Sequence, residues 1–260
     1  MPRFAANISL MYPEYPLIER IGAAARDGFA AVEVQFPYEV ESADFRRALD
    51  AAHVRLVLIN APVGQAATGR GYAALPGHEQ EFDVSIERAL DYARATGATR
   101  VHVMAGSPGA EVPHADALAA YERNLAKASA ALAAHGIVAT IEPINPYDIP
   151  GYFMNGLPLA LSVMERLGPS GPALQFDAYH LQIIHGDLIR RLREHIARIG
   201  HVQIAGVPAR NEPDRGEVNY PEIFRELDAL RYAGWVGAEY RPANPGPGGT
   251  SAGLGWLRGF

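Results

Sequence analysis

The chain has 260 residues, of which 48% are hydrophobic and 20% are charged, as expected of a globular protein with a sizeable core. Its formal charge of −6 gives no net attraction to a phosphate backbone, so we expect no nucleic-acid partner. The absence of cysteine excludes disulfides, thiolate zinc sites and cysteine nucleophiles. The sequence predicts neither a signal peptide nor a membrane span, so we expect a cytoplasmic protein without a membrane partner.

The chain opens with an apolar stretch at 4–10, and a joint then recurs along it: a helix-like segment ends in glycine and an apolar strand follows. Glycine suits the left-handed conformation that closes a helix. This joint is predicted at five positions, which are Gly28, Gly97, Gly136, Gly200 and Gly234. The pattern is typical of a chain built from repeated strand–helix units.

Between the joints, apolar residues recur with the period of an amphipathic helix. The two clearest faces are Phe82, Ile86, Ala89 and Ala93, and Ile223, Phe224, Leu227 and Leu230. The predicted strands are Phe4–Leu10, Ala31–Phe36, Val54–Asn60, Arg100–Ala105, Ile137–Pro143, Pro172–Asp177, His201–Ala205 and Trp235–Tyr240.

Eight strands alternating with helices, without a linker-like stretch, predict an α/β fold, a single (β/α)₈ TIM barrel spanning residues 1–260. A doubly wound open sheet is the alternative, but the turn after Ser9 reads LMYPEYP and lacks the glycine fingerprint of that fold. We interpret the glycine-rich segment from Gly246 to Gly253 as a tail.

Polar side chains come late in four of these strands. Glu142 closes the strand in TIEP, Asp177 closes LQFD, Gln203 lies in HVQIAG and Glu239 lies in GAEYRP. Each is about one strand–helix unit from the next, and the carboxyl ends of barrel strands meet at one mouth. We therefore expect the four side chains to converge.

Three carboxylates at one point repel one another unless a cation holds them. Oxygen ligands select a hard divalent ion, and the amide of Gln203 adds an oxygen without adding charge. The sequence thus predicts an Mg²⁺ or Mn²⁺ site formed by Glu142, Asp177, Gln203 and Glu239. The alternative is four unrelated polar residues at loop starts.

The same segments resemble a known family. IEPIN with PYDIPG, QFDAYH, HVQIAGVPARNEPDRGEVNYPEIF and WVGAEYRP are similar to the hydroxypyruvate isomerases, including the 2-oxo-tetronate isomerases, among the xylose-isomerase-like TIM barrels. The similarity runs from FAANISLMYPEYP at the N-terminus to WVGAEYRP and so covers nearly the whole chain.

The resemblance implies a metal-dependent aldose–ketose type isomerisation of a small hydroxy-oxo acid, such as hydroxypyruvate to tartronate semialdehyde. It implies that Glu142 and Glu239 ligate the metal and act as the proton-transfer pair, with Asp177 and Gln203 as further ligands. It also implies that His180 contacts substrate and that Arg210 belongs to the loop after the seventh strand. Such a reaction removes a proton next to a carbonyl and passes through an enediolate.

Other residues are open to two interpretations. A substrate carboxylate needs a cation, and Arg210 is the first candidate, with Arg70 in GRG as the alternative. Asp148 either orients a substrate hydroxyl or caps a turn. The loop Ala61–Gly77 is either a lid or a surface excursion. His102 and Asn7 either line the mouth or fill the barrel, and the remaining histidines receive no role.

Other functions remain open on the same barrel: a ketose 3-epimerase, a dehydratase of polyol-derived ketones, or a barrel that binds a sugar acid without catalysis. A zinc-dependent abasic-site endonuclease is disfavoured, because that chemistry uses a histidine-rich cluster and a basic face. By analogy with other barrels, a homo-oligomer would not be surprising.

Overall fold

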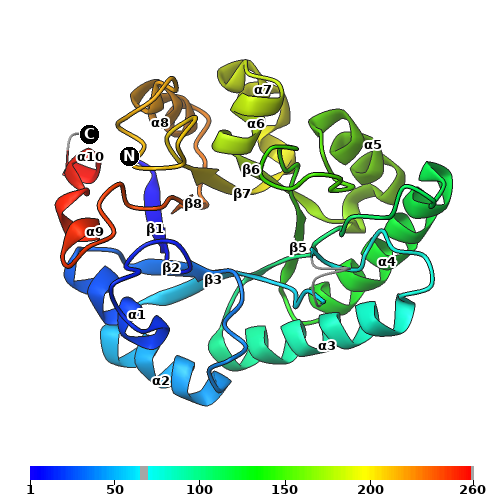
Figure 1. Cartoon of the computed structure of the whole chain (residues 1–260), viewed down its shortest axis with the longest axis horizontal. Helices are drawn as coiled ribbons and strands as arrows, with labels where there is room; N and C mark the ends of the chain where they lie inside the picture. Colours follow the sequence, from blue (N-terminus) through cyan, green and yellow to red (C-terminus); the bar gives the residue numbers. More distant parts are fainter. Residues whose placement is uncertain (65–69, 259–260) are drawn as a thin grey trace.

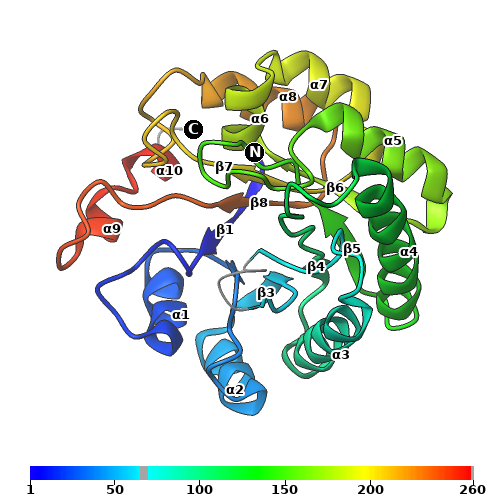
Figure 2. The same ribbon diagram turned by 45° about the vertical axis from the view of Figure 1, so that its right-hand side comes forward.

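A computed structural model describes residues 1–64 and 70–258 and shows a closed barrel of eight parallel strands in chain order, with helices around it (Figures 1 and 2). The strands are β1 Arg3–Asn7, β2 Ala31–Val34, β3 Arg55–Asn60, β4 Arg100–His102, β5 Val138–Ile141, β6 Ala173–Asp177, β7 Ile199–Ile204 and β8 Trp235–Ala238. The predicted (β/α)₈ barrel is confirmed.

Longer helices follow most of the strands, and short ones follow β6 and β8. The α-helices are α1 Leu17–Arg26, α2 Ser42–Ala52, α3 Glu79–Thr96, α4 His114–Ala133, α5 Leu157–Leu167, α6 Ala178–Ile184, α7 Leu188–His195, α8 Tyr220–Ala229, α9 Gly249–Ala252 and α10 Gly255–Arg258. Two 3₁₀ turns, η1 Gly168–Ser170 and η2 Ile196–Arg198, precede β6 and β7. No helix in the described ranges is both long and apolar enough to cross a bilayer.

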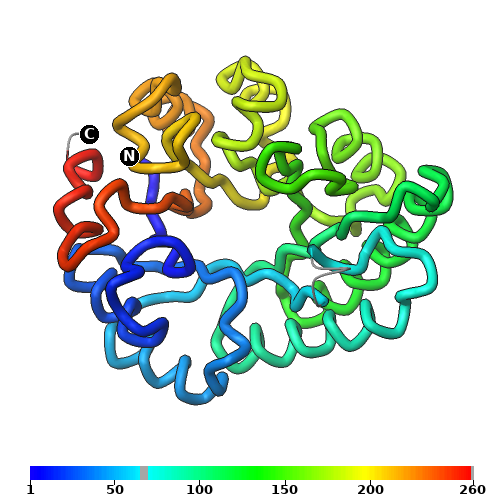
Figure 3. The backbone as a smooth tube through the Cα atoms, viewed as in Figure 1, coloured from blue at the N-terminus to red at the C-terminus, as the bar shows by residue number. Residues whose placement is uncertain are grey.

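The barrel closes through β1, which pairs with β2 on one side and β8 on the other. Ala6 is in register with Val32 of β2 and with Ala238 of β8. The first and last strands of the chain therefore lie side by side, with α9 and α10 next to β1 (Figure 3). Closure also brings the carboxyl ends of all eight strands to one face, where the following loops form the mouth.

All eight predicted strands are present, but most are shorter than predicted at the mouth, because their last residues already belong to loops. The strand β7 instead begins early, at Ile199, so that Gly200 lies inside it. A Cβ on Gly200 would approach the Cβ of Ala173 to 2.6 Å. This glycine thus permits close strand packing, and its prediction as a helix-closing residue is wrong.

The other glycine joints divide in the same way. Gly28, Gly97 and Gly136 have φ values of 96°, 80° and 70° and adopt the predicted left-handed conformation. Gly234 does not have a positive φ. A side chain there would collide with the ring of Tyr232, since its Cβ would lie 2.3 Å from the phenol oxygen.

The predicted helix faces pack against the barrel. Phe82, Ile86, Ala89 and Ala93 of α3 are all buried, and so are the first three predicted residues of the α8 face. Burying an aromatic or branched aliphatic side chain contributes roughly 1.5–3 kcal/mol. Only Leu230, which caps α8, remains half-buried.

The glycine-rich C-terminal segment is not a tail, contrary to the prediction. Thr250 in α9 is buried and accepts a hydrogen bond from the backbone N–H of Tyr12. Trp256 in α10 packs edge-to-face on Phe4 and donates to the hydroxyl of Tyr240. The glycines allow the chain to turn sharply before these residues dock against β1 and β8.

Candidate active site

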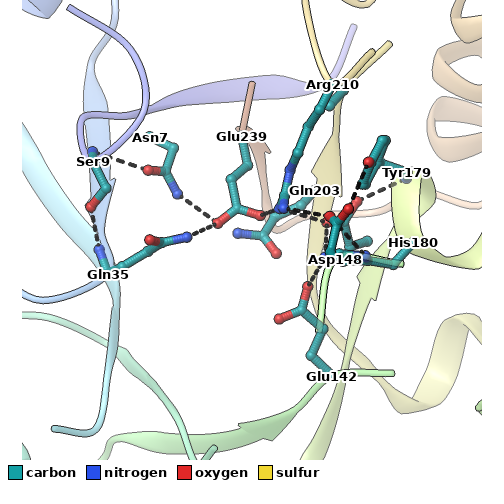
Figure 4. Close-up of polar contacts among 12 residues, drawn as sticks. Asn7, Ser9, Gln35, Glu142, Asp148, Tyr179, His180, Gln203, Arg210 and Glu239 are labelled. Atoms are coloured by element: carbon teal, nitrogen blue, oxygen red, sulfur yellow. Dashed lines mark hydrogen bonds and ion pairs between the residues drawn. The ribbon is translucent and has the colours of Figure 1, made fainter. Parts of the chain in front are cut away.

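The four polar residues predicted to converge do lie together at the barrel mouth, and Figure 4 shows three of them, Glu142, Gln203 and Glu239. Glu142 follows β5, Asp177 is the last residue of β6, Gln203 lies near the end of β7 and Glu239 follows β8. All four are between 0 and 5% exposed. Their positions follow from the parallel barrel, which ends each of these strands at the same level.

Arg210 lies among the carboxylates. Its Nη2 donates to Glu239 Oε2 at 2.8 Å and lies 3.7 Å from Asp177 Oδ2, while Nη1 reaches Asp148 Oδ2 at 3.1 Å. The guanidinium also stacks over the ring of Tyr179, at 4.9 Å from the ring centroid. Arg210 has a φ of 55°, an uncommon backbone conformation for a residue with a side chain.

A cavity of about 240 Å³ opens above these groups. Its walls combine three acids, Glu142, Asp148 and Glu239, with three arginines and a few apolar residues. The lining includes Gln35, Asn60, Arg70, His102, Met104, Glu142, Ile144, Asp148, His180, Arg210, Glu239 and Arg241. Cationic and acidic groups facing one small cavity suit a polar, anionic small molecule.

Burial and mutual repulsion raise the pKa of the acids in the absence of a metal ion. Burial, followed by the charges of Glu239 and Asp177, raises the pKa of Glu142 well above its ordinary value. Burial raises the pKa of Asp177 to about 7, against the opposing effect of Arg210. Burial also raises the pKa of Glu239. Such shifts are common at catalytic sites.

Arg210 responds in the opposite sense. Burial acts to lower its pKa, but the charges of Glu239, Asp177 and Glu142 outweigh burial and raise it. The guanidinium is therefore a permanent cation within an acidic site, and it partly neutralises the carboxylates around it.

His180 presents an N–H to the site, as its hydrogen bonds show. The Oδ1 of Asn145 accepts from the backbone N–H groups of Tyr147 and Asp148, so its Nδ2 must be the donor that faces Nδ1 of His180 at 2.7 Å. Burial lowers the pKa of His180 well below its ordinary value, so the ring is neutral and its proton is on Nε2.

Nε2 of His180 lies 3.6 Å from Asp177 Oδ2 and 3.8 Å from Glu142 Oε1. These three side chains form a group whose ligand atoms are close enough to hold one metal ion. Because Nε2 is protonated in this hydrogen-bond pattern, it is better suited to donate to a substrate oxygen than to ligate a metal.

The acids themselves fit a divalent cation. Glu142 Oε1 and Asp177 Oδ2 are buried and have no hydrogen-bond partner among residues 1–64 and 70–258, and unpaired buried carboxylate oxygens are costly. A hard cation would satisfy both. Glu239 and Gln203 lie beside them but are held differently: Glu239 bonds Arg210, and the Gln203 oxygen accepts from Gln175.

The remaining predicted residues also reach this region. Asp148 is bonded by the hydroxyl of Tyr179 and by Arg210, so it orients the arginine and does not simply cap a turn. Arg70 is exposed and lines the cavity. Part of the predicted lid Ala61–Gly77, residues 65–69, lies outside the described residues.

Gln35 and Gln175 of the site were not predicted. Gln35 donates to Glu239 and Gln175 donates to Glu142. Asn7 and His102, which the sequence allowed either to line the mouth or to fill the barrel, also reach the site. Asn7 is buried and donates to Glu239, and His102, whose pKa burial lowers to about 3, lines the cavity 3.4 Å from Glu142. The sequence signal was a polar residue inside an apolar run, as in AVEVQF and ALQFD, which the strand-end criterion passed over.

Known proteins resemble this chain over its full length. Residues 21–260 match the family described as xylose isomerase-like TIM barrel. The chain is 51% identical over 259 residues to a 2-oxo-tetronate isomerase of Cupriavidus necator, covering 99% of this chain and 98% of that protein. It is 37% identical to the hydroxypyruvate isomerase of Escherichia coli, covering 99% and 98%.

A solved structure from Brucella melitensis, described as an AP endonuclease of family 2, is 40% identical and superposes with a TM-score of 0.95, covering 100% of this chain and 99% of that one. The chain therefore belongs to the xylose isomerase-like TIM barrel family. The isomerases among its relatives confirm the predicted class of enzyme, an aldose–ketose type isomerase.

Proposed function

We propose that this isomerase acts on a small 2-oxo-3-hydroxy acid, with a 2-oxo-tetronate as the first candidate and hydroxypyruvate as the second. The observation that carries the proposal is the convergence of Glu142, Asp177 and Glu239 around the guanidinium of Arg210 beside the cavity. The 51% identity to a 2-oxo-tetronate isomerase, against 37% to a hydroxypyruvate isomerase, supports the order of the two acids.

The anionic substrate would be held by the arginines at the mouth. Arg210 donates to Glu239 and also lines the cavity. Its guanidinium would therefore release Glu239 and donate to the substrate carboxylate instead. Arg70 and Arg241 lie on the rim of the same cavity. With its carboxylate held in this way, the substrate would lie with its hydroxyl and carbonyl groups over the acids.

Glu142 and Glu239 are the proton-transfer pair in this proposal. Both are buried, and burial raises the pKa of each above its ordinary value, which brings a carboxylate closer to the strength needed to remove a carbon-bound proton at neutral pH. The two follow strands on different sides of the mouth. One can take the proton from the substrate carbon while the other returns a proton to the neighbouring carbon.

His180 complements the acids by donating Nε2–H to a substrate oxygen, where negative charge develops during proton removal. Burial of this histidine keeps water from competing for that proton.

A divalent ion, Mg²⁺ or Mn²⁺, would be held by Glu142 and Asp177 with Glu239 and Gln203. When bound, it supplies Lewis-acid stabilisation of the developing oxyanion. Among the described residues, only one group of three potential His, Asp or Glu ligands is close enough to hold an ion; it consists of Glu142, Asp177 and His180, and its two acids belong to the proposed ligand set. This favours one metal ion over the multi-metal cluster of an endonuclease, despite the description of the Brucella structure.

The test is turnover of both acids by the purified protein, followed by proton NMR with Mg²⁺ or Mn²⁺ and with EDTA. We expect metal-dependent isomerisation, with the higher kcat/KM on the 2-oxo-tetronate. Epimerisation of a ketose in preference to either acid would replace this proposal with the 3-epimerase. A product that has lost one water relative to the substrate would indicate the dehydratase. Metal binding without any turnover would indicate a barrel that only binds.

A further inference from the structure

An unbroken chain of buried side chains connects the two glutamates beneath the site. Gln175 Nε2 donates to Glu142 Oε2 at 3.2 Å and to Gln203 Oε1 at 2.7 Å, and Gln203 Nε2 donates to Glu33 Oε1 at 2.7 Å. All these side chains are at most 5% exposed. They come from neighbouring strands β5 to β7 and from β2 across the barrel.

The chain then returns to the second glutamate. Asn7 Nδ2 donates to Glu33 Oε1 at 2.9 Å and to Glu239 Oε1 at 3.0 Å. Glu33 is therefore the common acceptor of the two branches. Its other oxygen, Oε2, bonds Nε2 of His201 at 2.5 Å inside the barrel.

The direction of these hydrogen bonds follows from the chemistry of Glu33. Glu33 Oε1 accepts from two side-chain amides, whereas an amide has a donor side and an acceptor side. A carboxylate between Asn7 and Gln203 therefore turns the NH₂ of each amide toward itself. The carbonyl oxygen of Gln203 must then point away, toward the side occupied by Gln175 and Glu142.

The barrel makes room for this carboxylate. A Cβ on Gly237 would lie 2.2 Å from Glu33 Oε2, so any other residue at this position would displace the acid. Gly237 stands next to Gln203 in the β7–β8 register. The glycine and the acid thus fit each other at the level of the orienting hydrogen bonds.

We propose that Glu33 is a positioning residue for the metal site: it fixes the orientation of the Gln203 amide, so that its oxygen and not its nitrogen is offered to a cation beside Glu142 and Asp177. Glu33 is not among the described residues that line the cavity, and it acts through Gln203 and Asn7. This inference rests on the metal site of the proposed function.

The decisive comparison uses Glu33→Gln alone and combined with Gln203→Glu. Glu33→Gln leaves one side-chain oxygen for three donors, so either His201 or the two amides face an NH₂ group. Calorimetric titration of EDTA-treated protein with MnCl₂ should show affinity about 10- to 100-fold weaker than in the native protein, the usual cost of losing an orienting partner. Adding Gln203→Glu should recover affinity, because a carboxylate presents an oxygen whichever way it turns.

Thr140→Val is the matched control. The Thr140 hydroxyl donates to Gln175 Oε1 at 2.9 Å in the same buried network, but a hydroxyl can donate or accept and imposes no direction. This variant should lose stability and keep its affinity for Mn²⁺. Gly237→Ala provides a second route, and it should weaken Mn²⁺ binding by pushing the Glu33 carboxylate away.

Side-chain amide NMR of the metal-free protein supplies a readout that needs no metal. The Gln203 NH₂ signals, assigned by their loss in Gln203→Glu, should be protected from exchange in native protein and in Thr140→Val, and should shift and exchange faster in Glu33→Gln. Unchanged Gln203 signals in Glu33→Gln, or weakened Mn²⁺ binding that Gln203→Glu does not recover, would overturn the role of Glu33. A native protein that binds no Mn²⁺ would instead refute the proposed metal, and the amide signals alone would then decide the orienting role.

Discussion

Arg210 donates to Glu239 across 2.8 Å. Glu239 is one of the two proposed proton-transfer residues, and Arg210 is the only arginine of the described residues that forms an ion pair with the acids of the site. The same guanidinium lies 3.7 Å from Asp177. A cation in this place balances the buried acids and can also receive a substrate carboxylate. The two tasks give Arg210 separate effects on binding and on the pKa values of the acids.

Replacing Arg210 by alanine should raise KM for a carboxylate substrate, because the substrate would lose its charge-assisted hydrogen bonds. Such bonds contribute about 1.5–3 kcal/mol, which corresponds to roughly a 10- to 100-fold rise in KM. Arg70→Ala is the control, since Arg70 lines the cavity and, within the described part of the chain, forms no ion pair with an acid. Equal losses in the two variants would contradict the assignment of Arg210 as the main anchor.

Glu142→Gln and Glu239→Gln should each lower kcat by about 10²–10⁴-fold, the usual contribution of a general acid or base. Glutamine keeps the shape and removes both the base and the repulsion between buried acids. In metal-free protein, thermal unfolding should therefore show that Glu142→Gln is more stable than the native chain, since burial and neighbouring acids penalise the Glu142 charge. A folded variant with near-native kcat would exclude that glutamate from proton transfer.

The stability of the metal-free protein should depend on Asp177 in a defined pH window. Its pKa is about 7 in the folded protein and lower when unfolded, so between roughly pH 4 and pH 7 the folded state holds the proton more tightly and this group's contribution to stability falls as pH rises. Asp177→Asn should gain stability over the native chain across that window and level off above it. Denaturant unfolding at a series of pH values measures the difference, and a constant difference would refute the shift.

Metal binding should offset the loss of stability that the buried charge of Asp177 causes in the metal-free protein. At a free Mn²⁺ concentration of about 100 times Kd, binding stabilises a protein by about 2.7 kcal/mol, which for a chain of this size raises Tm by roughly 5–10 °C. The rise should vanish in Asp177→Asn, whose amide carries no charge. Ions bound elsewhere on the surface would give the same rise in both proteins.

His180→Asn should separate substrate contact from metal ligation. Because Asn145 occupies Nδ1 and leaves the proton on Nε2, we expect the Mn²⁺ affinity of the variant to match that of the native protein, while kcat/KM falls about 10²–10³-fold. A parallel loss of Mn²⁺ affinity in calorimetry would show that His180 is a ligand, which its distances to Glu142 and Asp177 also allow.

The barrel could be predicted from sequence because its strands are continuous apolar runs. The acids of the site could be predicted because residues that end such runs in a parallel barrel meet at its mouth. Glu33 and Gln175 escaped prediction because they lie within strands, and their partners come from strands far away in sequence. The position of Arg210 depends on a loop backbone with a positive φ, which no strand or helix period encodes. The C-terminal segment was misjudged because its docking residues, Thr250 and Trp256, are separated by glycines.

The measurement that tests the account most directly is solvent deuterium exchange at the reacting carbon of the substrate. A 2-oxo-tetronate or hydroxypyruvate is incubated in D₂O with Mn²⁺ and native protein, Glu142→Gln or Glu239→Gln, and the carbon-bound protons are followed by NMR. We predict deuterium at the carbon next to the carbonyl with native protein and a loss of exchange of at least about 10²-fold in both variants. Isomerisation without exchange in native protein, or exchange that survives in both variants, would contradict proton transfer by Glu142 and Glu239.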